Sequence, residues 1–444
     1  MNKMKTEQIS VESKKVRMRG KMIKMVGQLF EFIEKSVSCF HAVETIRKEL
    51  EEAGFQRLDE SEEWKITAGG KYYVIRNGSS IAAITMPINE VKGFHMTAAH
   101  SDSPTFKIKE KPEIAVEEQY IKLNTEKYGG MILSTWLDRP LSVAGRVIVR
   151  EHGELVSKLV NIDKDLLMIP NVAIHMNRDM NKGVEYNPQV DMLPLYSGIG
   201  KKGSFQSEIA EAAGVEKEAV LGSDLFLYVR EKGKVIGAGK EFIGAPRLDD
   251  LECAFGAVKA IVNAGNSSDY VNIAVVFDNE EVGSGTKQGA DSTFLPDILV
   301  RIKETLEKND TWFCRMIAGS FMVSADNAHA THPNHPEKAD PTNRPYLNGG
   351  IVIKYHGSQK YTTDGISAAV MKEVCKKAGV PYQTYANRSD ILGGSTLGNI
   401  STAHVSVDTV DIGLAQLAMH SAYETAGAKD VEYLVNALTT FFEQ

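Results

Sequence analysis

Most of the chain alternates between short apolar runs and longer stretches in which apolar residues recur every three to four positions. The short runs predict β-strands, and the periodic stretches predict helices that bury one face. Residues 21–54 have helical spacing, and Gly54 ends that pattern. The continuous apolar run Asn272–Phe277 predicts a strand whose two faces are both covered, as in parallel sheets. The other predicted strands are Tyr72–Ile75, Ile81–Thr85, Gly93–Ala99 and Gly350–Lys354, and the other predicted helices are Asp250–Ala264, Pro296–Lys308, Ile366–Ala378 and Asp430–Phe442.

The middle of the chain follows a different pattern. Between residues 105 and 238, short strand-like segments such as Gly145–Arg150 and Leu225–Val229 are separated by turn residues, and helices do not alternate with them. We therefore predict a discontinuous three-layer α/β domain made of residues 1–104 and 239–444. A β-rich inserted domain of residues 105–238 would interrupt it.

Composition narrows the class of protein. The 444 residues exceed the needs of one simple core, which agrees with two domains. The net charge is −7, and no basic run with interleaved aromatic residues is present, so nucleic acid is not an expected partner. No apolar run is long enough to span a membrane. No apolar signal core follows the polar, basic residues 1–20, which we expect to form an arm or a helix used in assembly.

The four cysteines indicate the compartment. Cys39, Cys253, Cys314 and Cys375 are scattered and form no Cys-x-x-Cys pair. This arrangement fits buried thiols in a reducing compartment better than a disulfide framework. We therefore predict a cytoplasmic protein.

Five potential metal ligands lie in separate short segments. Zinc binds histidine nitrogen and carboxylate oxygen at about 2.0–2.2 Å. Two terminal ligands for each metal and one shared carboxylate would hold a pair of ions about 3.5–4 Å apart. Two of the segments follow predicted strands, and sites in α/β folds lie beyond the carboxyl ends of strands. The pattern therefore predicts a two-metal hydrolase, with the ligands His100, Asp249, Glu281, Asp326 and His420.

Two further acids lie beside these ligands. Glu280 could accept a proton from an activated water without binding the metals. Asp102, two residues after His100, could orient that imidazole. Each residue taken singly also has an ordinary interpretation, such as a packed histidine, a helix cap at Asp249-Asp250 or a solvated helix start at Glu280-Glu281. The metal interpretation is favoured because several of these acids end strongly apolar runs, where a solvated charge is not expected.

Other motifs carry less weight. The chain has no His-Glu-x-x-His sequence, so the single-zinc helix motif is excluded. Gly283–Lys287 resembles a phosphate-binding loop but lacks its spacing. His329, His332 and His335 cluster after Asp326, and we interpret them as a pocket wall or structural loop and not as a metal site.

Taken together and in this order, these segments resemble the aspartyl aminopeptidase family, within the dinuclear zinc exopeptidases. The resemblance extends through most of the chain, from Cys39-Phe40-His41-Ala42-Val43 to Gln416-Leu417-Ala418-Met419-His420-Ser421. The segments between these ends that carry it are His100-Ser101-Asp102-Ser103-Pro104, Arg247-Leu248-Asp249-Asp250-Leu251, Asp278-Asn279-Glu280-Glu281-Val282-Gly283-Ser284 and Ser324-Ala325-Asp326-Asn327-Ala328-His329-Ala330.

The resemblance implies a reaction and a role for each residue. The reaction would be hydrolysis of the N-terminal peptide bond of a peptide substrate, with two zinc ions that cobalt or manganese could replace. Glu280 would be the general base and Asp102 the partner of His100. A cis peptide bond is implied after Asp249. The implied ligands are His100 and Asp326 for one ion, Glu281 and His420 for the other, and Asp249 as the bridge.

The resemblance also implies an assembly and a substrate pocket. The inserted domain of the family mediates dimerisation, and dimers assemble into a tetrahedral dodecamer. One histidine of that domain reaches a neighbour's active site, and Ile169–His175 resembles this segment, so His175 is the candidate. Lys354 matches a lysine that lines the pocket for an N-terminal Asp or Glu, although a surface lysine at a strand end is the alternative. Gly393–Thr396 departs from the acid-selective form of the substrate loop.

Alternative functions therefore stay open. A neutral-residue (Leu-type) aminopeptidase of the same family is one. Another dinuclear zinc exopeptidase or deacylase, such as a carboxypeptidase, is a second. The non-enzyme alternative is an assembly or cargo protein on this scaffold. It is disfavoured because all five ligands and the adjacent base are present.

Overall fold

The structure is a computed structural model that describes residues 20, 22–265 and 268–444. The arm predicted for residues 1–20 therefore falls outside the described residues, except for Gly20. Within the described ranges, no helix is both long and apolar enough to cross a membrane.

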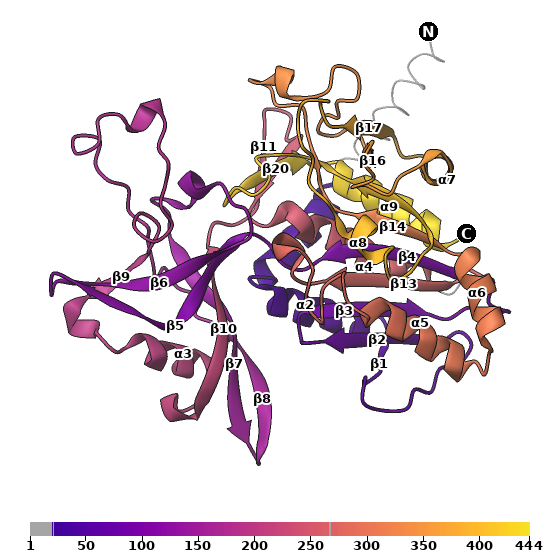
Figure 1. The fold of residues 1–444 in the computed structure, drawn as a ribbon, viewed down its shortest axis with the longest axis horizontal. Coiled ribbons are helices and arrows are strands. Elements are labelled where there is room, and N and C mark those ends of the chain that lie inside the picture. The colour runs from indigo at the N-terminus through magenta and orange to yellow at the C-terminus, as the bar shows by residue number, and fades with distance from the viewer. Residues whose placement is uncertain (1–19, 21, 266–267) are drawn as a thin grey trace, which may run out of the picture.

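A nine-stranded sheet forms the larger part of the molecule (Figure 1). Its strand order is β1-β2-β3-β13-β4-β14-β18-β16-β17, and the central strands β13, β4, β14 and β18 run parallel to one another. The strands are β1 (Gln56–Arg57), β2 (Lys71–Arg76), β3 (Ser80–Thr85), β4 (Phe94–His100), β13 (Val271–Phe277), β14 (Phe321–Ala325), β16 (Ile351–Tyr355), β17 (Tyr382–Ala386) and β18 (Asp408–Gly413).

Helices pack against both faces of this sheet. In β4, Ala99 belongs to one buried apolar cluster, whereas Phe94 and Met96 belong to another, because successive strand residues point to opposite faces. The helix over residues 22–35 packs on the first face together with α2 (Cys39–Glu52), α4 (Leu248–Ala264), α7 (Gly365–Ala378) and α9 (Asp430–Phe442). The second face is covered by α5 (Phe294–Thr305), α6 (Asp310–Ala318) and α8 (Leu397–Ser401).

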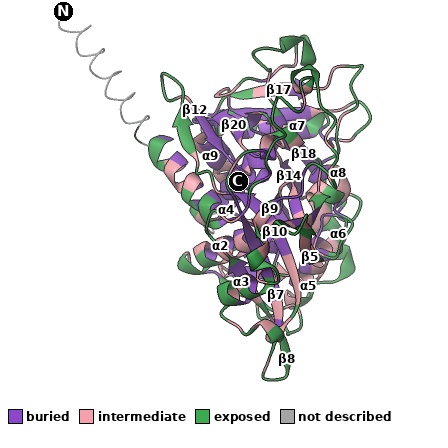
Figure 2. Ribbon diagram, turned by 90° about the vertical axis from the view of Figure 1, so that its left-hand side faces the viewer, coloured by how far each residue is buried: buried purple, intermediate pink, exposed green. Residues whose placement is uncertain are grey.

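A six-stranded antiparallel sheet lies beside the larger one, on the left of Figure 1. All its strands come from residues 105–229, and the tip between β7 and β8 is exposed (Figure 2). Phe205 and Ile209 of α3 (Phe205–Ala213) pack into its core. Its order is β8-β7-β10-β5-β6-β9, with bounds β5 (Thr105–Val116), β6 (Tyr120–Tyr128), β7 (Leu141–Glu151), β8 (Glu154–Asn161), β9 (Leu195–Gly198) and β10 (Val220–Val229).

A five-stranded sheet brings distant parts of the chain together. Its order is β11-β12-β20-β19-β15. Its strands are β11 (Lys234–Ile236), β12 (Phe242–Ala245), β15 (Ala328–His329), β19 (Ala415–Leu417) and β20 (Glu424–Gly427). The short 3₁₀ helices are η1 (Leu133–Trp136), η2 (Met180–Lys182), η3 (Ile199–Lys201), η4 (Lys217–Ala219), η5 (Glu280–Val282) and η6 (Pro336–Lys338). The result is a mixed α/β fold with several sheets.

Most predicted elements agree with the structure to within a few residues, but the prediction for residues 21–54 was wrong in one respect. The helix breaks after residue 35, and α2 begins at Cys39. Ser38 has extended backbone angles, and its side chain accepts a hydrogen bond from the His41 amide, so it caps a new helix. The helices α3, α6 and α8 and the strands β14, β17 and β18 of the nine-stranded sheet were not predicted from the sequence.

Candidate metal centre

Three parallel strands deliver acidic and histidine side chains to one edge of the nine-stranded sheet. His100 is the last residue of β4 and lies opposite Phe277, the last residue of β13. Glu280 and Glu281 follow β13 in η5. Asp326 follows β14, which pairs with the other side of β4. The structure thus brings His100, the two glutamates and Asp326 to the same sheet edge.

Asp249 and His420 approach from the five-stranded sheet. Asp249 lies at the start of α4, and the peptide bond between Asp249 and Asp250 is cis, as the resemblance implied. His420 lies in the turn between β19 and β20 with a φ of 65°. The carboxylate of Glu424 accepts hydrogen bonds from the Asp249 amide at 3.1 Å and from the His420 amide at 2.8 Å. One buried carboxylate therefore fixes the backbone of both residues.

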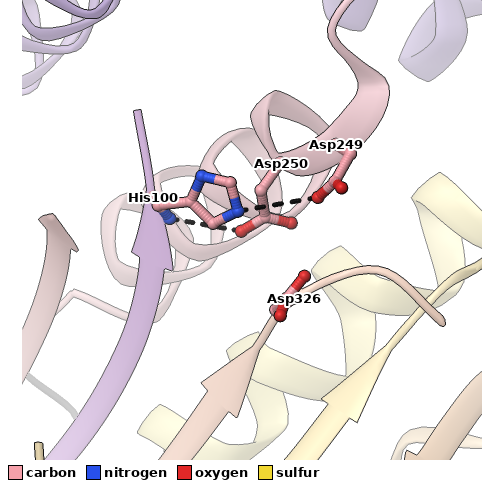
Figure 3. A group of neighbouring side chains, drawn as sticks. All are labelled: His100, Asp249, Asp250 and Asp326. Carbon is pink, nitrogen blue, oxygen red and sulfur yellow. Dashed lines mark hydrogen bonds and ion pairs between the residues drawn. The ribbon is translucent and has the colours of Figure 1, made fainter. Parts of the chain in front are cut away.

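The two oxygens of Asp249 face two different histidines. Oδ1 is 3.5 Å from His100 Nε2, and Oδ2 is 3.2 Å from His420 Nε2. His420 Nε2 is also 3.5 Å from Glu281 Oε2. On the other side, His100, Asp249, Asp250 and Asp326 converge (Figure 3). Asp249 belongs both to this group and to the group that it forms with Glu281 and His420.

These separations fit bound zinc. Neighbouring ligand atoms of a tetrahedral zinc are about 3.3 Å apart when the bonds are about 2.0–2.1 Å long. Asp249 Oδ1, Asp250 Oδ1 and Glu281 Oε1 are buried without a hydrogen-bond partner among the described residues. Buried carboxylate oxygens without partners are costly, and divalent cations would satisfy them. All five residues predicted as ligands belong to the three groups of side chains that could hold an ion.

The charges of the cluster also favour a bound cation. Burial and the nearby carboxylate of Asp249 raise the pKa of Glu281 well above its usual range. Burial raises the pKa of Asp326 as well, although Lys354 opposes this. Burial also raises the pKa of Asp249, but its contacts with His100 and His420 more than offset this and leave the pKa below its ordinary value. The centre is an acid-rich, buried environment that a cation would stabilise.

Asp102 does more than the sequence predicted. His100 Nδ1 lies 3.3 Å from Asp102 Oδ1 and donates to the Asp102 carbonyl oxygen at 3.0 Å, which leaves Nε2 facing Asp249. The same carboxylate accepts from the backbone amides of Glu280 and Glu281, both at 3.2 Å. Asp102 thus fixes one histidine and the segment that carries both glutamates.

Glu280 and Lys354 flank the centre. Burial raises the pKa of Glu280 to about 8. Lys354 is only 2% exposed, so the surface-lysine alternative is wrong. Its Nζ donates to the Asp326 carbonyl oxygen at 2.8 Å and lies 3.5 Å from Asp326 Oδ2. Burial lowers the pKa of Lys354, but the charge of Asp326 outweighs this and keeps the lysine protonated.

The remaining candidates lie elsewhere. His175 is exposed, in an irregular segment of the chain between β8 and β9. His332 and His335 form a two-residue β-bridge, and His335 contacts Glu337 at 3.2 Å. Gly283–Lys287 follows η5 in turn conformation and forms no helix start, which a phosphate loop would need.

Sequence reasoning missed three residues of this region: Tyr128, Glu424 and Asn327. The Asn327 side-chain amide donates to Gln416 Oε1 at 2.7 Å and to the Leu248 carbonyl oxygen at 3.2 Å. It therefore joins the segments that precede His420 and Asp249 to the segment of Asp326. Only its position next to Asp326 could have drawn attention to it.

Comparison with known proteins gives one family. Residues 32–442 match the model of the aminopeptidase I zinc metalloproteases, M18. A "Probable M18 family aminopeptidase 2" of Clostridium novyi is 48% identical over 428 residues, which cover 95% of this chain and 99% of the relative. A protein of the same description from Pseudomonas aeruginosa is 40% identical, covering 93% of this chain and 97% of the relative.

Solved structures agree with this match. A chain in the cryo-EM structure of the Ape4 and Nbr1 complex superposes with a TM-score of 0.93 at 35% identity, covering 95% of this chain and 86% of that chain. A chain of the S. cerevisiae mApe1 dodecamer superposes with a TM-score of 0.82 at 28% identity, covering 94% of this chain and 96% of that chain.

Proposed function

The chain belongs to the M18 family of zinc metalloproteases and is a metal-dependent aminopeptidase, and from this premise we propose how its own residues act. His100 and Asp326 would hold one zinc ion, Glu281 and His420 would hold a second, and Asp249 would be shared by both. The observation that carries this assignment is the position of Asp249, whose Oδ1 and Oδ2 lie 3.5 and 3.2 Å from the Nε2 atoms of two different histidines.

The reaction is hydrolysis of the N-terminal peptide bond. Bound zinc supplies a Lewis acid for the scissile carbonyl and lowers the pKa of water, and cobalt or manganese could substitute for it. Glu280 accepts the proton of the attacking water and delivers it to the leaving amine. Asp102 supports both functions because it contacts His100 and the amides of Glu280 and Glu281.

Lys354 bears on the choice of N-terminal residue. In the first candidate function, this buried cation attracts an acidic Asp or Glu side chain of the substrate. The second candidate is a neutral-residue aminopeptidase. It is favoured by the position of Lys354 Nζ, which already donates to Asp326 and lies 3.5 Å from its carboxylate. A lysine in this position holds a proposed metal ligand in place. Its charge is already partly neutralised by Asp326, so it attracts an acidic substrate side chain less strongly.

A substrate panel tests the reaction and the specificity together. Asp-, Glu- and Leu-anilides are compared with their N-acetylated forms on the zinc-loaded enzyme. We expect hydrolysis of the free amines only, whereas turnover of the acetylated forms would favour a deacylase or another exopeptidase. If Lys354 binds acidic side chains, Lys354→Ala lowers the Asp-to-Leu ratio of kcat/KM by about 10-fold or more.

A control keeps this test specific. Lys376→Ala removes a lysine whose side chain is 76% exposed and, among the described residues, forms an ion pair with Glu373 alone, so it should leave the ratio unchanged. An unchanged ratio in Lys354→Ala, with activity falling equally on all three anilides, removes Lys354 from substrate selection and supports the neutral-residue candidate.

The organisation of the chain supports a further part of the proposal. The three-layer catalytic domain would comprise residues 1–104 and 239–444, and residues 105–238 would form the inserted dimerisation domain. The supporting observation is that all strands of the six-stranded sheet come from residues 105–229. Self-association into dimers and a dodecamer, with His175 reaching a neighbouring active site, stays a prediction. It is supported by the dodecamer of the similar S. cerevisiae mApe1.

A further inference from the structure

The segment Tyr128–Gly130 leaves the six-stranded sheet at the end of β6 and reaches the metal centre. It contacts Asp102, Glu281 and His420.

Tyr128 makes the first contact. Its hydroxyl donates to Asp102 Oδ2 at 2.7 Å and accepts from Asn279 Nδ2 at 2.8 Å. The ring packs edge-on against Phe226 of β10, with the centroids 5.5 Å apart. The six-stranded sheet therefore holds the ring and so the position of its hydroxyl. Asp102 accepts hydrogen bonds from the amides of Glu280 and Glu281. Tyr128 therefore holds the segment that carries both glutamates in two ways, through Asp102 and through Asn279.

Gly129 makes the second contact. Its φ is 78°, a conformation that favours glycine. A Cβ at this position would lie 3.0 Å from Glu281 Cβ and 3.4 Å from Glu281 Oε2. The bare backbone of Gly129 therefore forms the wall against which the Glu281 side chain rests.

Gly130 makes the third contact. Its carbonyl oxygen accepts a hydrogen bond from His420 Nδ1 at 2.5 Å. Since the proton then lies on Nδ1, the lone pair of Nε2 faces Asp249 and Glu281. The backbone amide of Ile132, two residues on, also donates to the His420 carbonyl oxygen at 3.0 Å. The chain that follows β6 thus holds both the ring and the backbone of this histidine.

We propose that the Tyr128–Gly130 segment is a positioning element for the metal ion held by Glu281 and His420. A movement of the six-stranded sheet relative to the nine-stranded sheet would then change the affinity of the protein for this ion. The six-stranded sheet would thereby affect the reaction. The ion held by His100 and Asp326 depends on the segment less, since only the contact of Tyr128 with Asp102 leads to it. This inference rests on the proposed two-metal centre.

Metal titration of the apoenzyme tests the proposal without measuring turnover. Gly129→Ala is compared with Gly153→Ala, a glycine of the same sheet with a φ of 89° and open space around its Cβ position. Both substitutions add the same backbone strain, but only Gly129→Ala pushes on Glu281. In zinc titrations followed by calorimetry, we expect Gly129→Ala to weaken one of the two zinc equivalents by about 10-fold or more, with the other equivalent and Gly153→Ala unchanged.

A second variant covers the case in which Gly129→Ala does not fold. Tyr128→Phe removes only the hydroxyl, and Tyr120→Phe at the exposed other end of β6 is its control. We expect Tyr128→Phe to lower zinc affinity by about 10-fold, whereas Tyr120→Phe should leave zinc affinity unchanged. Equal affinities in Tyr128→Phe and the wild type, or equal weakening of both ions in Gly129→Ala, would overturn the proposal. A wild-type enzyme that binds fewer than two ions would instead overturn the two-metal centre on which it rests.

Discussion

Asp249 is the residue at which the two parts of the centre meet. It is 3% exposed and is held by Glu424 through its backbone amide, so its carboxylate is free to face His100 with one oxygen and His420 with the other. The sequence drew attention to these residues because acids that end apolar runs are unusual, and the structure brings them together. It could not reveal Glu424, the first residue of β20, since no local feature of the sequence marks this acid as buried.

Glu280→Gln should keep the metals and lose turnover. The amide is isosteric but cannot accept the proton of water, so kcat should fall by about 10² or more. Zinc content measured on the same sample should match the wild type, because Glu280 is not among the five proposed ligands. The residue lies within reach of His100 and Glu281 as a further ligand, so loss of zinc together with activity would instead make it a ligand. A fall in kcat smaller than this would exclude it as the base.

At the scale of elements, the site depends on where strands end and how closely they approach. Asn272–Phe277 and Asp430–Phe442 were predicted almost to the residue. A strand buried on both faces gives a continuous apolar run, and a helix buried along one face gives a clear periodicity. The five-residue strand β14, which delivers Asp326, was not predicted although β16 of the same length was, because so short an apolar run does not distinguish a strand from a helix segment. The break at Ser38 was missed because apolar spacing continues across it.

Gly413, the last residue of β18, illustrates this close approach. A Cβ there would lie 2.0 Å from the carbonyl oxygen of Asp326, a backbone atom that cannot move without shifting the metal ligand. We expect Gly413→Ala to lower the free energy of unfolding by about 1–3 kcal/mol and to weaken zinc binding, as measured by denaturant melts and metal titration. Gly222→Ala, also in a strand but with open space around it, should be neutral. Equal stability of the two variants would contradict this expectation and show that the backbone of β18 can shift to make room for the methyl group.

At the scale of the whole molecule, three sheets contribute to one site. The nine-stranded sheet provides His100, Glu281 and Asp326, the five-stranded sheet provides the turn with His420, and the six-stranded sheet adds the segment Tyr128–Gly130. The sequence predicted a separate β-rich region from its pattern of short strands. It could not predict that this region touches the metal centre, because those contacts are made by a backbone carbonyl, a glycine and one tyrosine.

The central claim is that one carboxylate joins two metal positions, and zinc content per chain tests it most directly. Elemental analysis of the purified protein should find two zinc ions per chain in the wild type and one in His420→Ala. Asp249→Ala should lose both, because each ion shares that carboxylate. Two zinc ions retained by Asp249→Ala, or a single ion in the fully loaded wild type, would contradict the account.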